Sequence, residues 1–334
     1  LLKSFTTFSS RFYVCIIFLM EEKLTLFKNR KRFGIEKNID LIFKNTTLAL
    51  SSLVAIVLFG IILVVFFQSF ESFSRYGLNF LVTSEWNPVK DEYGAFTAIY
   101  GTLVTSLLSL LITIPLGVGT AIFITEDFVP KFVREIVGSF VELLAAIPSV
   151  VLGLWAIFVM EPFFREFFVF LHKFFGWIPL FSSEPAGRNS LLAIIILVVM
   201  LLPIVTSIAR DSLNQVPKKL RNASYGIGAS RWKTIFSVIL PAALSGIMAG
   251  VLLALGRAMG ETMAVTMIIG NSNVFSWSLL SPGYTISSML ANQFGEADGS
   301  QVSSLFYAAF VLMILSLVVN IFAQWLVKKF SLKY

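Results

Sequence analysis

Six segments of this sequence are long and apolar enough to cross a membrane as helices. A helix needs roughly 20 mostly apolar residues to span about 30 Å of hydrocarbon. The segments that qualify are 46–70, 95–125, 136–160, 190–209, 241–269 and 302–327. The composition agrees, because 57% of the 334 residues are hydrophobic and 13% are charged, whereas an ordinary soluble domain has about 25% charged residues. The sequence therefore predicts an all-α polytopic membrane protein with six transmembrane helices.

Lysine and arginine orient these spans, because basic residues are retained on the cytoplasmic side. With the N-terminus inside, the inner connections carry 20 of the 26 Lys and Arg residues and the outer connections carry five. We therefore expect both termini to be cytoplasmic, with a cytoplasmic segment 1–45 and a transmembrane domain 46–330 whose cytoplasmic coupling loop is 210–240. Residues 1–19 are expected not to be native, since the first methionine is Met20 and no small-residue cleavage site follows this leader.

The residue types that carry most enzyme chemistry are scarce. One cysteine, Cys15, and one histidine, His172, leave no cluster with metal-ligand spacing, and there is no GxxxxGK[ST] loop to bind ATP. His172 lies in the aromatic outer segment 161–189, which we expect at the membrane interface, with a structural role for the histidine. The net charge of +7 is spread between apolar spans, which does not favour nucleic acid. We expect a transport subunit without cofactor or metal.

Two opposite charges, Arg257 and Glu261, lie inside the fifth apolar segment. A charge at bilayer depth costs roughly 2.5–3.5 kcal/mol and usually faces a polar interior. On one continuous helix the two residues would share a face within ion-pair reach. Small residues that allow close helix approach recur beside them every fourth position: Gly246, Gly250, Ala254 and Ala258. We expect the pair to face the bundle and line an anion path, since guanidinium binds oxyanions well; the alternative is a structural ion pair, with Glu142 as a further partner.

The third segment contains Pro148, Ser149 and Gly153. These residues either break the helix and turn polar groups such as the Ser149 hydroxyl toward the path, or only permit close packing. Thr262 and Thr266 are further candidates for the path.

The connection between the fourth and fifth segments has a helical pattern of its own. Apolar residues recur there at helical spacing: Val216, Leu220, Ala223 and Ile227. Pro217 suits the first helical position and Gly228 suits the end. The pattern predicts a short amphipathic helix, a turn, and a second helix from about Ser230 to Pro241. It is either an ordinary surface helix or a ridge that inserts into a groove on a partner.

The stretch NASYGIGASRWKTIFSVILP resembles the loop motif of ABC importer permeases: EAA, three residues, Gly, nine residues, Ile, any residue, Leu-Pro. Four positions match the motif: Ala223, Gly228, Leu240 and Pro241. Three depart from it, with Asn222 in place of Glu, Ser224 in place of Ala, and Val238 in place of Ile. In that family the loop docks on the ATPase subunit, so the resemblance implies that these residues form an ATPase coupling loop.

Three further stretches resemble the phosphate-specific permeases of the PstC type: GRAMGETMAVTMIIGN (256–271), LLAAIPSVVLGLWAI (143–157) and SPGYTISSMLANQF (281–294). The resemblance covers essentially 45–330. It implies a type I ABC importer (MetI-like) fold in the prokaryotic plasma membrane and ATP-driven import of inorganic phosphate. It also implies a second permease (PstA-like), two ATPase subunits (PstB-like) and an extracytoplasmic phosphate-binding protein (PstS-like).

Three alternative functions remain open from the residues. One arginine does not distinguish phosphate from another tetrahedral oxyanion, so a permease for a different oxyanion is the first. The others are a membrane scaffold that senses phosphate without carrying flux, and a secondary transporter, which would show two related halves with broken helices.

Overall fold

The computed structural model describes residues 34–330, and the leader 1–19 lies outside this range. The chain divides into two compact units, Leu1–Ile61 and Ile62–Tyr334. In the first unit, the described residues form the N-terminal part of helix α2 (Gly34–Tyr76). Apolar side chains are exposed on all sides of this part of α2, as on a helix whose surroundings are apolar.

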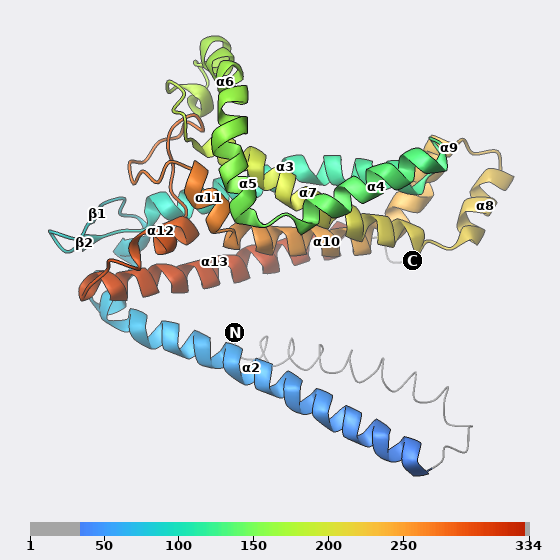
Figure 1. The fold of residues 1–334 in the computed structure, drawn as a ribbon, viewed down its shortest axis with the longest axis horizontal. Coiled ribbons are helices and arrows are strands. Elements are labelled where there is room, and N and C mark those ends of the chain that lie inside the picture. The colour runs from blue at the N-terminus through green and yellow to red at the C-terminus, as the bar shows by residue number, and fades with distance from the viewer. Residues whose placement is uncertain (1–33, 331–334) are drawn as a thin grey trace. The chain divides into compact units, whose positions relative to one another are not determined.

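Within residues 34–330, five helical stretches are long and apolar enough to cross a membrane, and a bent pair of helices counts as a sixth only if the two helices form one broken span (Figure 1). The five are α2, α3 (Phe96–Thr125), α7 (Ser190–Asn214), the continuous stretch Arg231–Gly260 and α13 (Ser300–Phe330). The bent pair is α4 (Lys131–Ala146) and the stretch Ser149–Phe175, which meet at 100°. These elements confirm the all-α membrane fold and five of the six predicted segments, whereas the third segment, 136–160, is divided between the two helices of the bent pair.

The centre of the second unit is α7, which packs against both α3 and α10 (Leu240–Gly260). Its side chains are buried along much of its length, with Leu192, Ile196 and Leu201 essentially inaccessible. Glycines bring α10 close to α7: a Cβ on Gly250 would lie 2.9 Å from Ile208 Cβ, and one on Gly246 would lie 2.3 Å from Ser212 Oγ. The prediction that this stripe of small residues permits close helix packing is confirmed.

One end of the second unit carries short elements between the long helices. They are a 3-10 turn (Gly77–Leu81), a two-stranded antiparallel hairpin of β1 (Trp86–Asn87) and β2 (Glu92–Tyr93), α11 (Met263–Ile268) and α12 (Ile286–Gln293). Phe80 and Tyr307 stack at 4.4 Å between ring centroids and tie this hairpin region to α13. The Ser300 hydroxyl donates to the carboxylate of Asp91 in the hairpin turn and, with Arg75, lowers the pKa of that carboxyl.

The connection after α11 folds back onto α3 and does not simply pass over the surface. Thr97 donates from its hydroxyl to the carbonyl of Asn273, and the backbone N–H of Ile286 donates to the Thr102 hydroxyl. At Gly101 the connection lies very close to α3, because a Cβ there would be 2.0 Å from the Tyr284 carbonyl oxygen. A side chain at position 101 is therefore incompatible with the present packing.

Gly101→Ala is expected to destabilise the fold by about 1–3 kcal/mol, because the added methyl group must displace a backbone carbonyl. The matched control is Gly119→Ala on the same helix, where nothing lies within 4 Å of the new Cβ and helix propensity favours alanine by up to about 1 kcal/mol. Thermal unfolding of the purified complex measures both variants. Equal midpoints for the two would contradict the close approach.

Candidate functional site

Two membrane helices of the second unit are interrupted, and the interruptions lie on neighbouring elements. The first break, at 147–148, separates α4 from α5 (Ser149–Trp155), and the second, at 261–262, separates α10 from α11. The helices that follow the two breaks pack together: a Cβ on Gly153 would lie 2.8 Å from Met267 Sδ and 3.2 Å from Ala264 Cα. Broken helices at membrane depth are tolerated where they are buried in protein or line a polar cavity.

Proline accounts for the first break. Pro148 has no N–H to donate and disfavours a helical conformation in the preceding residue, and Ile147 is accordingly extended with ψ 125°. Ser149 is the first residue of the new helix and is half-buried. Pro148 therefore breaks the helix and Gly153 permits its close packing on α11, while a role of the Ser149 hydroxyl on the path stays a prediction.

The second break corrects the expected pairing of Arg257 with Glu261. The helix ends at Gly260 and the backbone of Glu261 is extended, with ψ 119°. Its carboxylate accepts a long hydrogen bond of 3.5 Å from the backbone N–H of Ala264, and the Thr262 hydroxyl donates to the Gly260 carbonyl at 3.0 Å. Within residues 34–330 no ion pair joins Arg257 to Glu261. The prediction assumed one continuous helix, which glycine and two local side-chain bonds interrupt.

Arg257 lies on the face of α10 that this chain leaves open. The exposed residues of α10 share one helical face: Ser245, Ala249, Leu253, Gly256, Arg257 and Gly260. The buried stripe of small residues lies on another face, toward α7. Within this chain Arg257 is therefore exposed and does not belong to the buried stripe that packs on α7, and its place on the anion path stays a prediction. Its guanidinium is available to a ligand or to a second subunit.

The other expected path residues lie beside the second break and are less exposed than Arg257. Glu261, Thr262 and Thr266 are half-buried. Thr266 donates from its hydroxyl to the Thr262 carbonyl at 2.6 Å, so it is already satisfied within its own turn. Among these residues, Glu261 carries the charge nearest to the break.

Glu142 does not approach Arg257 as the structural alternative required. It forms an ion pair with Arg210 of α7, at 3.3 Å. The pair borders a groove of about 350 Å³ between α4 and the ends of α3 and α7, which Lys131, Arg134 and Glu135 also line. The sequence marked Glu142 as an intramembrane charge, but its partner lies 68 residues away and no periodicity connects the two.

The predicted coupling loop forms two short helices, α8 (Lys218–Gly226) and α9 (Arg231–Thr234). Gly228 has φ +85°, a left-handed conformation that suits glycine after a helix. Ser230 caps α9 by accepting from the Lys233 backbone N–H. Pro217 is the residue before the helix and not its first residue, which is a one-residue correction. From α9 the helix continues through a π-helical turn (Ile235–Ile239) into α10, where Leu240 and Pro241 are half-buried.

The two faces of α8 differ sharply. On the inner face, the buried Ser224 hydroxyl hydrogen-bonds the Thr234 hydroxyl at 2.9 Å. The outer face carries Leu220 and Ala223, both exposed, and leads to Ile227, which is 87% exposed. Of the predicted apolar repeat only Val216 is buried in this chain. We call Leu220, Ala223 and Ile227 the α8 ridge; Asn222 is exposed beside it.

A buried ion pair holds α8 in place. Arg221 pairs with Glu126, just after the end of α3, and the two side chains are only 19% and 11% exposed. Arg221 also donates to the Leu213 carbonyl at 3.0 Å. This pair could not be predicted from the sequence, because the two residues lie 95 positions apart.

Arg221→Met is expected to loosen α8. Hydrogen bonds to charged groups contribute about 1.5–3 kcal/mol, so amide hydrogen exchange in α8 should rise about 10-fold or more. Lys219→Gln on the same helix is the control, because Lys219 is exposed. Exchange in the Arg221 variant that matches the control would show that the pair does not hold the helix.

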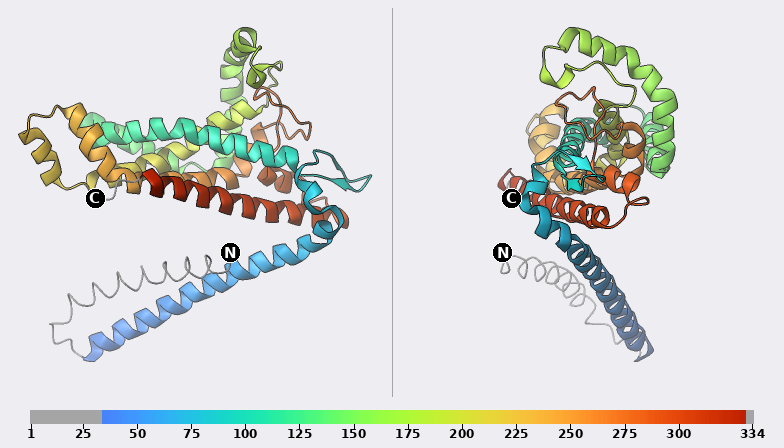
Figure 2. Two further views of the ribbon diagram at one scale, coloured as in Figure 1. Left: turned by 180° about the vertical axis from the view of Figure 1, so that it is seen from behind. Right: turned by 90° about the vertical axis from the view of Figure 1, so that its left-hand side faces the viewer.

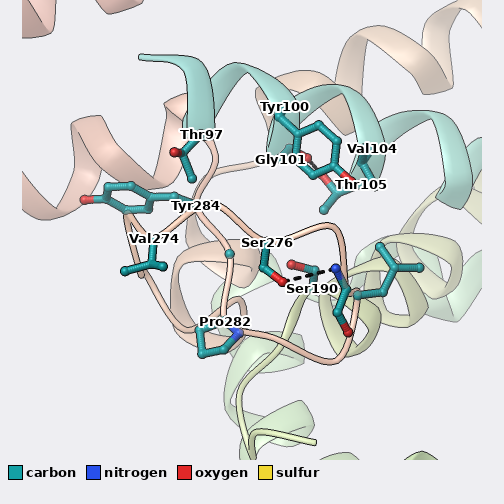
Figure 3. A pocket seen from close by; sticks show the side chains of 13 residues that line it. Thr97, Tyr100, Gly101, Val104, Thr105, Ser190, Val274, Ser276, Pro282 and Tyr284 are labelled. Atoms are coloured by element: carbon teal, nitrogen blue, oxygen red, sulfur yellow. Dashed lines mark hydrogen bonds between the residues drawn. The ribbon is translucent and has the colours of Figure 1, made fainter. Parts of the chain in front are cut away.

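At the opposite end of α3, hydroxyl-bearing side chains surround a small cavity of about 20 Å³ (Figure 3). Thr97, Tyr100, Thr105, Ser190 and Ser276 line it together with the connection after α11. This volume suits about one water molecule. It is too small for a tetrahedral oxyanion. We therefore do not place the anion site at this packed end of the bundle.

Comparison with known proteins places this arrangement in a family. The family described as "Binding-protein-dependent transport system inner membrane component" matches residues 113–332. The chain is 39% identical over 300 residues to the phosphate transport system permease protein PstC of Pasteurella multocida, covering 88% of this chain and 93% of that protein. It is 40% identical over 305 residues to PstC of Mesorhizobium japonicum, with 90% and 92% covered.

A solved structure shows the same fold. A chain of a bacterial alginate ABC transporter, crystallised with an alginate pentasaccharide-bound periplasmic protein, superposes with a TM-score of 0.59 at 17% identity. The match covers 88% of this chain and 96% of that chain. By its sequence and its fold, the chain therefore belongs to the binding-protein-dependent transport system inner membrane components, and the two relatives compared above are PstC permeases.

Proposed function

We propose that this chain is the permease subunit of an ATP-driven importer of inorganic phosphate, and that Arg257 lies on the anion path. The names of the PstC relatives support the substrate. The observation that carries the path is the exposed Arg257 guanidinium on α10, three residues before the end of an interrupted helix. A charge at this depth of an apolar segment is expected to be functional.

The path runs between this chain and a second, PstA-like permease. Gly256 and Gly260 flank Arg257 on the open face of α10, and no atom lies within 4 Å of a Cβ built at either position. Small residues on an exposed membrane face allow another helix to approach closely. Arg257 then faces the seam between the two permeases, and Glu261 and Thr262 follow it at the second break, while Ser149 begins the helix after the first break.

Guanidinium offers phosphate a planar pair of N–H donors. Transport also requires release, so the site must not hold the anion too tightly. Glu261 lies in the second break, four residues after Arg257. Its carboxylate supplies a negative charge that weakens retention of the anion. In this chain the carboxylate accepts only a long hydrogen bond from the Ala264 N–H.

Coupling runs through the α8 ridge, which presents an exposed apolar surface to one of two PstB-like ATPase subunits. Arg221 fixes α8 to the end of α3, and α9 joins it to the helix that ends at Gly260. Closure of the ATPases on ATP moves α8 and, through this helix, the face that carries Arg257. A PstS-like binding protein delivers phosphate on the outer side.

Glu261→Gln separates the charge of this residue from its structural role, because the amide oxygen still accepts from the Ala264 N–H. We expect the complex to assemble normally and phosphate uptake to fall by about 10-fold, the effect of roughly 1.4 kcal/mol. Uptake of radioactive phosphate into vesicles containing the complex measures this. Uptake at the level of the unmodified complex would remove Glu261 from the path.

The function itself is tested with the complex reconstituted together with its binding protein. Uptake should require ATP, and unlabelled phosphate should compete where sulfate and molybdate do not. Equal competition by sulfate or molybdate would favour the oxyanion alternative. Uptake driven by an ion gradient without ATP would identify a secondary transporter, and copurification of a kinase alone would favour the sensory scaffold.

A further inference from the structure

The helix that follows the first break leaves the bundle. From Ser149 the chain is helical through α5, a π-helical turn (Ala156–Met160) and α6 (Glu161–Phe175), and this stretch makes an angle of 100° with α4. α4 packs against α7, so α6 runs across the direction of the spans, as two views show (Figures 1 and 2). A helix in this orientation lies along the membrane plane and does not cross it.

One face of α6 is fixed to the chain. Phe168 is 1% exposed and packs into the same apolar cluster as Leu192 and Ile196 of α7, with Phe164 and Leu171 partly buried beside it. His172 hydrogen-bonds through Nδ1 to the Phe181 carbonyl at 2.9 Å, which confirms the structural contact expected for it. The orientation of α6 about its own axis is therefore set by packing.

A second face of α6 carries a continuous exposed stripe of large aromatic side chains, which continues just past the end of the helix to Trp177. They recur at spacings of four, three, four and three residues: Phe163, Phe167, Phe170, Phe174 and Trp177. Phe163 is 75% exposed and Trp177 81% exposed. We call these five residues the aromatic stripe. Exposed Glu166 and Lys173 occupy a third face.

We propose that α6 lies in the outer lipid interface, with the aromatic stripe at the boundary between head groups and acyl chains. The Lys and Arg distribution puts this connection on the outer side. Aromatic rings favour the headgroup level, and a helix of this kind lies in the interface with its apolar face toward the lipid. Lys173, about a quarter turn around the helix from the stripe, reaches lipid phosphates while its stem covers the boundary, whereas Arg165 lies on the side of α6 opposite the stripe.

Lipid is a better occupant for the aromatic stripe than water. In water, a row of five exposed aromatic residues would be an uncovered apolar surface of the kind that soluble proteins avoid. The perpendicular orientation of α6 places this whole edge at one membrane depth, which is the geometry that an interface requires.

The only cysteine, Cys15, makes a direct test practical. In a Cys15→Ser background, single cysteines at 163, 167, 170 and 174 are spin-labelled in the assembled complex in phospholipid vesicles. Collision rates with oxygen, which concentrates in lipid, and with a water-soluble nickel chelate are then compared. Positions 166 and 173 on the charged face of the same helix are the matched controls, and retained ATPase activity verifies each labelled complex.

We expect the oxygen-to-nickel ratio to oscillate along α6 with a period of about 3.6 residues, highest on the aromatic stripe and lowest at 166 and 173. Preferential access of nickel to the stripe would show that it faces water and would overturn the proposal. Protection of the stripe from both reagents would show that a protein subunit covers it. A high ratio at all positions would show that α6 crosses the bilayer. None of these readings requires phosphate transport, so they stand apart from the proposed function.

Discussion

Replacing Arg257 with glutamine is expected to lower phosphate uptake by the reconstituted transporter about 10- to 100-fold, while the complex still assembles. A hydrogen bond to a charged group contributes about 1.5–3 kcal/mol, and each 1.4 kcal/mol is a factor of ten. Assembly should survive because Arg257 is exposed on its own chain and has no acidic partner among residues 34–330. Its removal therefore leaves no buried charge unpaired.

Initial rates of radioactive phosphate uptake into vesicles measure this effect, with gel filtration to verify the complex. Arg257→Lys should retain part of the activity, since it keeps the charge but loses the planar fork. Lys90→Gln, at an exposed position in the hairpin region, is the control and should transport normally. Normal uptake by both Arg257 variants would exclude this residue from the path.

Replacing Ile227 with aspartate is expected to abolish copurification of the ATPase subunit and, with it, ATP-driven uptake. Ile227 is 87% exposed in this chain, so its own fold tolerates the change. An ionised carboxylate in the apolar contact of the α8 ridge would be desolvated without a partner, which costs several kcal/mol. A loss of several kcal/mol in binding free energy is enough to dissociate a complex of ordinary affinity.

Asn222→Glu is the matched control for this prediction. It adds the same charge to the same exposed helix, at the position where the importer motif has glutamate. Pull-down of the ATPase subunit and ATP hydrolysis stimulated by the binding protein measure both variants. Retention of the ATPase by the Ile227 variant would show that the ridge is not the docking surface, and its loss from both variants would show that any negative charge on α8 is harmful.

Features that depend on nearby residues could be predicted from the sequence. The spans follow from long apolar runs, the α8 and α9 helices follow from Pro217 and Gly228, and the first break follows from Pro148. Each of these features rests on backbone geometry within a few residues. They were predicted with errors of a few residues at most of the ends, although α2 begins 12 residues before the expected segment.

Features that depend on tertiary packing could not be predicted. The fifth segment has small residues on two faces, one containing Gly250 and Ala254 and the other Gly256 and Gly260. Only the position of α7 decides that the first face is buried and that Arg257 accompanies the second. The end of α10 at Gly260 was also missed, because the residues after it favour a helix and the capping bonds of Glu261 and Thr262 form only once the chain turns.

The continuous stretch Arg231–Gly260 has a mechanical consequence. Its 30 residues make a rod about 45 Å long, and the rod comes closest to α7 at Gly246. When a rod tilts about such a contact, its two ends move in opposite directions. The arm from Gly246 to Arg231 spans 15 residues and the arm from Gly246 to Arg257 spans 11, so a displacement applied at the cytoplasmic end arrives at Arg257 reversed in direction and reduced by about a quarter.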